Sequence, residues 1–381
     1  MTGLNLHLYP SAMLNESRLF RIGTSLQESG CFTATHLVGI SGAGLPAREE
    51  IASGVVIVRI GTSADGASRG RLRRLLGLAG WMPRIFRRYG REKVSAVAAH
   101  SVWMLPLAWL LAVRTGAILV YNPHELETGT PNMRSGRKVV AQTVERLLIR
   151  KARIVTAVNQ SIGCWYAERY AGVEPLVVRN IPRQEPASAR LRERLGLSPE
   201  PFLFVHTGRL TAGRGIPQIL AAFEEMSGPD DPMVVFLGDG PMKADVERAS
   251  ERHSHVHLLG PVPAHEVVDT IRDADAAVML IDTESLSYQY SSPNKMFEAL
   301  SASLPILSTP LEELQRSLAG MNTEAWRLGS VAELSEIAKL RTRADVAKFR
   351  EEWPGLPTWD SEVAPLVSAV CASVGRTGEG R

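Results

Sequence analysis

The stretch that decides the fold is Tyr288–Pro310, which reads YQYSSPNKMFEALSASLPILSTP. It follows the apolar run Ala276–Ile281, which predicts a buried strand. Ser291 and Ser292 belong to the residue types that cap helices, and Pro293 suits a first helical position because its missing N–H is not needed there. The pattern therefore predicts a strand followed closely by the open N-terminus of a helix.

The start of this predicted helix is suited to an anion. A helix N-terminus offers free N–H groups and the positive end of the helix dipole, and Lys295 adds a full charge. Glu298 lies one turn past Asn294 on the same helix face, where a carboxylate can accept hydrogen bonds from sugar hydroxyls. A helix start that can bind phosphate, with a carboxylate one turn further on that can bind hydroxyls, indicates a nucleotide-sugar ligand. The candidate donor-binding residues are therefore Ser292, Asn294, Lys295 and Glu298.

These residues resemble the donor-binding motif of the retaining glycosyltransferases of family 4, which have the two-domain GT-B fold. In that family a Glu at the position of Glu298 holds the ribose of the donor, and many members carry another Glu eight residues earlier. Tyr290 stands at that earlier position here, so the two-Glu form is absent. The form Pro-Asn-Lys-x-Phe-Glu is similar to a variant found among surface-polysaccharide transferases.

The rest of the chain agrees with an α/β fold of two domains. Its 381 residues suffice for two domains, and its 45% hydrophobic and 22% charged residues are typical of a soluble globular protein. Short apolar runs alternate with helical stretches, which predicts parallel sheets with covered faces. The predicted strands are Leu4–Leu8, Thr35–Ile40, Val55–Ile60, Val94–Ala99, Ala117–Tyr121, Ile154–Val158, Leu176–Val178, Phe202–His206, Met233–Leu237, Val256–Leu259, Ala276–Ile281 and Ile306–Ser308.

The proline-containing stretch Asn180–Ala189 is a plausible linker between the two halves. We therefore expect an acceptor-binding domain over residues 1–183 and a nucleotide-sugar-binding domain over residues 184–357. The resemblance implies two Rossmann-like, doubly wound domains facing each other across a cleft, with residues 358–381 crossing back onto the first.

Several features indicate a cytoplasmic protein. Cys31, Cys164 and Cys371 are far apart and form neither a metal-binding spacing nor a disulfide framework, which favours a reducing compartment. No signal peptide is visible at the N-terminus. The most apolar stretch, Val102–Tyr121, contains a proline, an arginine and a glycine, so we expect a buried helix plus a strand rather than a membrane span.

Two loops of the second domain are candidates for contact with the diphosphate or the nucleoside. Gly208 and Arg209 follow a strand, and Arg214 lies five residues further on; glycines permit close approach, and arginines grip phosphate with forked donors. The family carries basic residues at both places, although isolated arginines are also common on solvated surfaces. By resemblance, the turn with Gly238 and Gly240 lies beside the nucleotide and the loop with Val262 lies against its base, but an ordinary turn is the alternative for the glycines.

The segment Asn122–Glu127 resembles the family's Asp-x-His-Glu segment, with Asn122 in place of Asp. The resemblance places His124 near the transferred sugar, where it would hydrogen-bond the sugar or help manage a proton. A structural histidine at a strand end is the alternative. Glu125 and Glu127 are either acceptor-side groups or helix N-terminal acids, and the second reading is favoured for Glu127.

Two further segments bear on the acceptor. Asn15–Arg18 replaces the glycine-rich loop of many relatives and either meets the acceptor or begins a helix, with Asn15 as its cap. Arg69–Lys93 interleaves basic and apolar residues, as in segments that lie on anionic membranes. A solvated helix covering the sheet is the alternative. Nucleic-acid binding is disfavoured because the net charge is only +3 and no reader motif accompanies the segment.

Together with these residues, the resemblance implies a retaining, metal-independent glycosyltransferase, which we expect at the inner face of the plasma membrane with a UDP- or GDP-type sugar donor and no cofactor. His124, Arg209, Arg214 and Glu298 are the catalytic candidates, and a lipid-linked or polysaccharide intermediate of cell-surface glycan is the expected acceptor. Retention is expected to proceed by front-face attack, as the family implies. The triplet Asp273–Asp275 precedes a buried strand, away from the carboxyl ends where ligands bind, and is interpreted as a turn rather than a metal site.

Two alternatives remain open at this stage. A sugar-nucleotide 2-epimerase would use the same scaffold but would need several acid–base side chains around the sugar. A non-catalytic, membrane-associated partner of a transferase would keep only the nucleotide site, and Tyr290 in place of the usual first Glu keeps this reading open.

Overall fold

The computed structural model describes residues 3–14, 16–61, 71–130, 133, 135–281 and 286–378. It consists of two compact units, each described separately below. The first comprises Met1–Arg179 and Asp360–Arg381, and the second comprises Asn180–Trp359. These divisions fall a few residues from the expected ones after residues 183 and 357.

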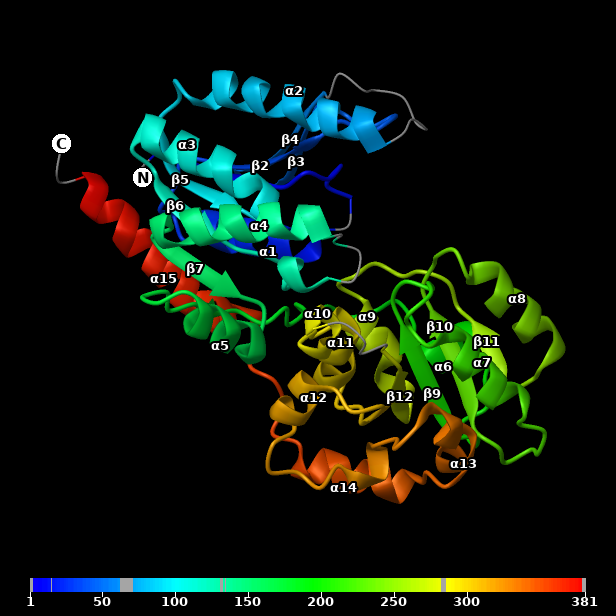
Figure 1. Cartoon of the computed structure of the whole chain (residues 1–381). Coiled ribbons are helices and arrows are strands. Elements are labelled where there is room, and N and C mark those ends of the chain that lie inside the picture. Colours follow the sequence, from blue (N-terminus) through cyan, green and yellow to red (C-terminus); the bar gives the residue numbers. More distant parts are fainter. Residues whose placement is uncertain are drawn as a thin grey trace. The chain divides into compact units, whose positions relative to one another are not determined.

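The first unit is built on an eight-stranded sheet of order β3-β4-β2-β1-β5-β6-β7-β8 (Figure 1). Every neighbouring pair is parallel except β3 with β4. The strand β3 was not predicted because its sequence REEIA has no apolar run, and it is an exposed edge strand that buries no face. The strands are β1 (Leu4–Leu8), β2 (Thr35–Ile40), β3 (Arg48–Ala52), β4 (Val55–Ile60), β5 (Val94–Ala99), β6 (Ile118–Tyr121), β7 (Ile154–Ala157) and β8 (Leu176–Val177).

Helices cover this sheet, and α2 packs beside α3 and α3 beside α4 (Figure 1). The apolar stretch Val102–Tyr121 is broken as predicted: Gly116 takes a left-handed backbone with φ 73° and ends α3 before β6 begins. No helix in the described ranges is long and apolar enough to cross a membrane. The helices are α1 (Ser17–Glu28), α2 (Arg71–Tyr89), η1 (Val102–Met104), α3 (Leu105–Thr115), η2 (Glu127–Gly129), α4 (Ser135–Leu148), η3 (Ile149–Lys151), α5 (Gln160–Arg169) and α15 (Trp359–Gly378).

The prediction that the cysteines form no disulfide is wrong. The last helix, α15, returns to the first unit and brings Cys371 next to Cys31, with 5.8 Å between their Cα atoms and a bond between their sulfurs. The two positions are 340 residues apart, so nothing in their spacing indicates the pair. Cys164 is free. The argument from cysteines to a reducing compartment therefore loses its basis.

The second unit has a five-stranded parallel sheet of order β11-β10-β9-β12-β13 (Figure 1). Its strands are β9 (Leu203–Thr207), β10 (Met233–Leu237), β11 (Val256–Leu258), β12 (Ala276–Met279) and β13 (Ile306–Ser308). Its helices are α6 (Leu191–Leu195), α7 (Ile216–Glu224), α8 (Lys243–Arg252), α9 (Val267–Thr270), η4 (Ile271–Asp273), α10 (Leu286–Gln289), α11 (Asn294–Ser301), α12 (Glu312–Ser317), η5 (Glu324–Trp326), η6 (Val331–Glu333), α13 (Leu334–Lys339) and α14 (Arg343–Glu352).

Both faces of this second sheet are buried, as the continuous apolar strands predict. Along β9, Leu203 and Val205 belong to one core cluster, whereas Phe204 belongs to the other. Phe297 on α11 packs in the first cluster and Ile219 on α7 packs in the second. Buried on both faces, the sheet holds its carboxyl edge as a rigid platform for the loops that follow the strands.

Candidate functional site

In the second unit, Lys295 of α11 and His206 of β9 meet at the carboxyl edge of the sheet. The Lys295 Nζ lies 3.0 Å from His206 Nε2, and His206 Nδ1 lies 3.2 Å from the Val278 carbonyl oxygen. The carbonyl accepts only, so Nδ1 carries the imidazole proton and Nε2 accepts from Lys295. Burial, together with the charge of Arg214, lowers the pKa of Lys295 to about 7. Burial and the charge of Lys295 hold the pKa of His206 well below 6.5, so the ring is neutral.

The two candidate arginines of this unit lie in different settings. Arg214 is half-buried, its charge acts on Lys295 and His206, and its guanidinium carbon lies 6.0 Å from the centre of the Tyr288 ring. Arg209 is exposed, and no ion pair with it is found in the described part of the chain. The structure therefore gathers Arg214 and Lys295 into one cationic pair and leaves Arg209 on the loop surface.

Glu298 is positioned one turn further along α11. Its Oε2 accepts a hydrogen bond of 2.7 Å from Thr207 Oγ1 at the end of β9. This bond ties the helix to the strand and orients the carboxylate at the same edge as Lys295. Neither Thr207 nor His206 was among the predicted site residues, although both directly precede the candidate Gly208 in the sequence.

The predicted capping of α11 is wrong in detail. Pro293, not a serine, occupies the N-cap position, and no side-chain cap bond is present there. Ser291 Oγ instead donates to the Tyr288 carbonyl at the end of α10. Because proline has no cap side chain, its neighbours' N–H groups at the helix start are left for another acceptor. Asn294 Oδ1 accepts from Asn180 Nδ2 at 2.5 Å.

Gly238 and Gly240 allow the loops after β9 and β10 to pack closely against each other. A Cβ added to Gly238 would lie 1.9 Å from the Gly208 carbonyl oxygen, and one added to Gly240 would lie 2.3 Å from that of Leu210. The loops after β9 and β10 therefore run against each other, held by hydrogen bonds such as Gly208 N to Leu237 O at 2.9 Å. Val262 is half-buried and packs against the core.

In the first unit, three histidines form a chain at the carboxyl edge of the sheet. His7 Nδ1 lies 2.7 Å from His100 Nε2, and His100 Nδ1 lies 2.8 Å from His124 Nε2. His7 and His100 are fully buried, whereas His124 is half-buried. They belong to β1 and to the residues that follow β5 and β6, which are neighbouring strands. The ring of Tyr9 lies 4.9 Å from that of His124, centre to centre.

The acidic residues beside His124 differ in role. Glu127 Oε2 accepts from Ser101 Oγ at 3.1 Å and from the Val102 amide at 2.9 Å, so it serves the N-terminus of η1. Burial raises its pKa to about 8. Glu125 is exposed.

The segment expected to replace the glycine-rich loop is largely structural. Arg18 is buried on α1, donating to the Val178 carbonyl at 2.5 Å and to Asn122 Oδ1 at 3.2 Å. Asn122 also accepts from Thr156 Oγ1 at 2.7 Å. Asn15 lies outside the described residues, and Glu16 occupies the N-cap position of α1. Arg18 is thus not free to meet an acceptor.

The acidic triplet at the start of β12 is engaged by the protein itself. Asp273 accepts from the backbone amides of Leu191 and Arg192, at 3.2 and 3.0 Å. Asp275 pairs with Arg192 at 2.8 Å and with Arg343 at 3.1 Å. Within the described residues no cluster of acidic, histidine and cysteine side chains could hold a metal ion.

The basic segment Arg69–Lys93 is described in part. Residues 69 and 70 lie outside the described residues, as do the side chains of residues 71–79. In the described part of α2, Trp81 and Ile85 are fully buried, whereas Arg84 and Arg88 are exposed. Here the apolar residues belong to the core, as the alternative of a covering helix predicted, and the basic residues face solvent.

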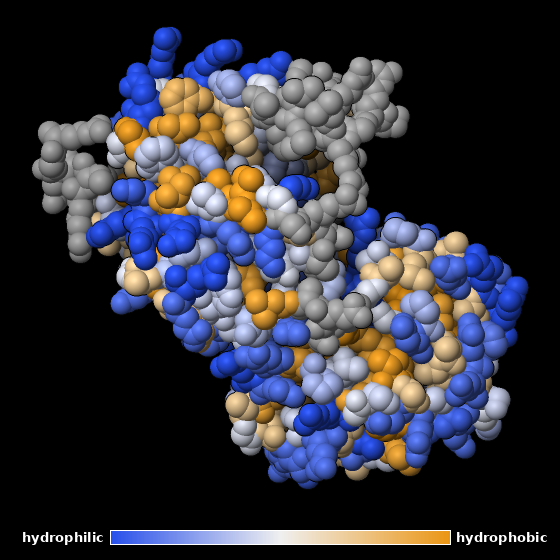
Figure 2. Space-filling model, in the orientation of Figure 1, coloured by the Kyte–Doolittle hydropathy of each residue, from blue (hydrophilic) through white to orange (hydrophobic). Residues whose placement is uncertain are grey.

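Exposed apolar residues lie instead on the neighbouring helices. Leu110 and Val113 on α3 are 48% and 66% exposed, and the α4 residues Val139, Val140 and Leu147 are 61%, 52% and 65% exposed. Figure 2 shows apolar side chains gathered over this part of the first unit with hydrophilic ones around them. We call these five residues the α3–α4 apolar surface.

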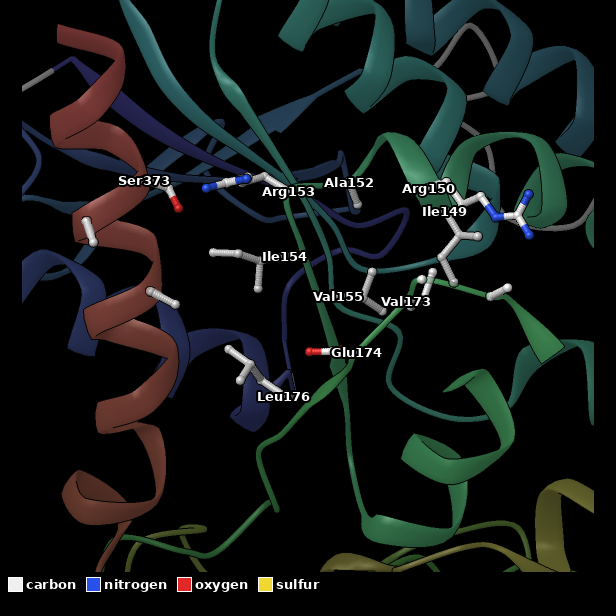
Figure 3. Close-up of a pocket in the computed structure, with 14 residues that line it drawn as sticks. Ile149, Arg150, Ala152, Arg153, Ile154, Val155, Val173, Glu174, Leu176 and Ser373 are labelled. Carbon is white, nitrogen blue, oxygen red and sulfur yellow. The ribbon is translucent and has the colours of Figure 1, made fainter. Parts of the chain in front are cut away.

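A pocket of the first unit lies at the opposite edge of its sheet. It is lined by the beginnings of β7 and β8, including Ile154 and Leu176, and by Ser373 of α15. Figure 3 shows the Arg153 side chain extending toward Ser373. Ligands of parallel α/β sheets bind at the carboxyl ends of strands, so we assign this pocket no part in the site.

Comparison with known proteins identifies both halves of the chain. The family described as "Glycosyl transferase 4-like domain" matches residues 18–184, and the one described as "Glycosyl transferases group 1" matches residues 201–339. The putative teichuronic acid biosynthesis glycosyltransferase TuaC of Bacillus subtilis strain 168 is 34% identical over 125 residues. That match covers 33% of this chain and 29% of TuaC.

Solved structures resemble the whole chain. Sucrose-phosphate synthase from Thermosynechococcus elongatus has a TM-score of 0.71 at 15% identity, with 100% of this chain and 98% of that chain covered. Anabaena HepE in complex with UDP-glucose has a TM-score of 0.64 at 16% identity, with 100% and 99% covered. At these identities the likeness shows the fold, which is GT-B.

Proposed function

We infer that this chain, which belongs to the family-4 glycosyltransferases, is a retaining enzyme that moves a sugar from a nucleoside-diphosphate sugar to an intermediate of cell-surface glycan. The observation that carries the proposal is the grouping of Lys295, Arg214 and Glu298 at the start of α11. Two cationic groups and an uncapped helix N-terminus suit a diphosphate. A carboxylate one turn deeper suits a ribose.

In this proposal the second unit binds the donor. Arg214, Lys295 and the α11 N-terminus stabilise the charge that develops on the leaving diphosphate, which needs no metal ion. Ser292 and Asn294 line the same helix start, and Arg209 lies on the adjacent loop. Anabaena HepE was crystallised with UDP-glucose, which favours a UDP donor here. His124 of the first unit is the proposed sugar-binding histidine.

The first experiment is a thermal shift with UDP, GDP, ADP, dTDP, CMP and UDP-glucose on the wild type and on Glu298→Ala. A ligand that binds only the native state raises the melting temperature by mass action. We expect one nucleotide to raise it in the wild type and far less in the variant. No rise with any nucleotide would contradict the donor site.

Transfer itself is tested with the nucleotide-sugar so identified and a lipid-linked acceptor. We expect a glycan product that keeps the donor's anomeric configuration by NMR and forms equally well in excess chelator. Release of a free epimerised nucleotide-sugar would indicate the epimerase instead. Nucleotide binding without any product, across acceptors, would indicate the non-catalytic partner.

We also propose that the first unit docks peripherally on the anionic, cytoplasmic face of the plasma membrane. The α3–α4 apolar surface has Arg84, Arg88 and Arg114 exposed on α2 and α3 nearby. Exposed apolar groups beside cationic ones are what an anionic bilayer surface binds.

Sedimentation with vesicles containing or lacking anionic lipid tests this docking. We expect binding to anionic vesicles that Val113→Ser combined with Arg88→Glu reduces at least fivefold. Arg316→Glu, at an exposed site of the second unit, is the matched control. Equal binding of all variants would contradict the proposal.

A further inference from the structure

The chain of hydrogen-bonded histidines in the first unit begins at Asn5, whose side-chain amide is oriented by Thr35 and Gln27. Thr35 Oγ1 donates to Gln27 Oε1 at 3.0 Å, so its own oxygen is free to accept from Asn5 Nδ2 at 3.3 Å. The same Asn5 nitrogen lies 2.9 Å from His7 Nε2. An amide nitrogen has two protons and no acceptor capacity, so His7 Nε2 must accept.

The donor and acceptor roles at His7 fix those of the next two histidines. Because His7 Nε2 accepts, the single proton of the neutral ring is on Nδ1, which donates to His100 Nε2. His100 must then carry its proton on Nδ1, which donates to His124 Nε2. The proton of His124 is left on its own Nδ1. No residue in the described ranges hydrogen-bonds that nitrogen.

The surroundings keep the rings neutral. Each contact between two ring nitrogens has room for one proton, and a second would place two N–H groups against each other. Burial lowers the pKa of His7 to about 3, and burial together with the nearby charge of Arg18 lowers that of His124 to about 3. Tyr9 packs against the His124 ring and restricts its rotation.

We propose that Asn5, His7 and His100 are positioning residues that hold His124 as a neutral imidazole with its proton on Nδ1, so that it meets a bound sugar as a hydrogen-bond donor. The nature of the ligand rests on the proposed function, whereas the protonation state of His124 does not. His124 is then no general base, because one nitrogen is protonated and the other already accepts.

The tautomers of the three histidines depend on the residue at position 5, at the buried end of the hydrogen-bonded series. If the residue at position 5 accepted instead of donating, His7 would carry its proton on Nε2 and every ring would turn to the opposite tautomer. His124 would then present a bare Nδ1. One buried amide therefore decides whether the edge of the sheet offers a donor or an acceptor.

The test is NMR of the full chain with nitrogen-15-labelled histidine, with the His124 signals assigned by their loss in His124→Asn. In the wild type we expect Nδ1 protonated and Nε2 unprotonated at every pH from 5.5 to 8. A proton on Nε2, or titration of His124 within that range, would overturn the proposal. No substrate is needed, so a failure of the proposed function leaves this result readable.

Asn5→Asp tests the anchor, because a carboxylate accepts from His7. We expect His124 to move to the Nε2-protonated form, although nothing near it has changed. Ser95→Ala is the control, since Ser95 Oγ accepts from the Gly3 amide at 2.7 Å beside β1 but outside the chain. A folded Asn5→Asp protein with His124 still protonated on Nδ1 would overturn the anchor. If this variant does not fold, the wild-type spectrum decides.

Kinetics of transfer give a second readout. An asparagine amide at position 124 can place an N–H where Nδ1 lies, whereas a glutamine reaches the place of Nε2. We expect His124→Asn to keep at least tenfold more activity than His124→Gln, in line with one hydrogen bond. The reverse order would contradict donation from Nδ1. If the wild type shows no transfer activity with any donor, this would instead contradict the proposed function.

Discussion

Both sheets have buried histidines at their carboxyl edges, but the electrostatic environments of these histidines differ. In the first unit His7, His100 and His124 bond to one another and to an amide, so the group that reaches the surface is uncharged. In the second unit His206 accepts from Lys295, whose charge lies beside that of Arg214. Similar parallel sheets therefore present a neutral donor at one edge and a cationic pair at the other.

This difference matches the two kinds of ligand that a glycosyl transfer needs. A polyhydroxyl ligand has no net charge and is recognised by hydrogen bonds of fixed direction, which a neutral chain of fixed tautomer supplies. A diphosphate is recognised by positive charge, which burial strengthens because the local dielectric is low. The following tests alter one edge and leave the other unchanged.

The largest effect is expected from Lys295→Met. Removing a preorganised charge that stabilises the leaving diphosphate costs about a hundred- to a thousandfold in transfer rate. The measurement is kcat/KM with the identified donor, together with the nucleotide affinity. Lys243→Met is the matched control, because Lys243 forms only an exposed pair with Glu247 at 3.3 Å on α8. An unchanged rate in Lys295→Met would remove the cationic edge from the mechanism.

Acid should destabilise the first unit through its buried histidines. Its buried histidines have pKa values below their unfolded value of 6.5, so the unfolded chain binds more protons and stability is lost as pH falls below about 6.5. Each contributes up to about 1.4 kcal/mol per pH unit. The first unit has four histidines with lowered pKa values, His7, His36, His100 and His124, and the second has His206 and His257. In the first unit the raised pKa values of Glu16, Glu127 and Glu145 act in the opposite direction.

Hydrogen exchange between pH 7 and 4.5, corrected for the intrinsic exchange rate, reports this effect through the amides of β1 and β5, with those of β9 and β10 as the reference set. The quantity compared is the slope of protection against pH in each set. His7→Asn should reduce the slope for the first set and leave the reference set as it was. A slope for the first set that His7→Asn leaves unchanged would mean that His7 is charged in the native state.

Sequence reasoning located most strands and the α11 site but not the histidine chain. Long apolar runs between helices leave few alternatives, so the strands β1, β2, β4, β5, β10 and β13 have the predicted bounds. His7 lies inside one such run and His100 directly after another, and no motif joins them. A signal was available nonetheless: His100 and His124 both follow strands that turned out to be neighbours in the sheet.

The remaining errors have physical causes of their own. The cap of α11 was assigned from residue preference, but the chain entered the helix one residue later and placed Pro293 at the cap. Edge strand β3 and the Cys31–Cys371 bond depend on tertiary contacts that local patterns do not encode. Arg209 and Arg214 are the same residue type at nearby positions, so the sequence does not tell which is buried. In the folded protein Arg214 is half-buried and Arg209 is exposed.

A smaller effect is expected on the pH dependence of donor binding. Free Lys295 has a pKa of about 7, and a bound diphosphate raises it because the negative charge favours the protonated amine. Binding is therefore strongest below pH 7 and weakens by up to about tenfold per pH unit above it. Calorimetry with UDP-glucose in buffers of different ionisation heat should show proton uptake at pH 8, absent in Lys295→Met. No uptake in the wild type would mean that Lys295 is already fully protonated at pH 8 before the donor arrives.

The smallest effect concerns Glu127, an acid whose charge acts on Tyr9 beside His124. Its pKa is raised to about 8, so between pH 4.5 and 8 the native state holds a proton that the unfolded state has lost, and stability falls as pH rises through that window. The slope is at most about 1.4 kcal/mol per pH unit, and the hydrogen bonds from Ser101 and Val102 oppose the shift. Glu127→Gln keeps an oxygen for both donors and removes the titration. We therefore expect urea unfolding at pH 8 to show a gain in stability over the wild type that vanishes at pH 5, with exposed Glu92→Gln unchanged. A variant no more stable than the wild type at pH 8 would mean that Glu127 is ionised in the native protein, and the edge that bears His124 would then be anionic rather than neutral.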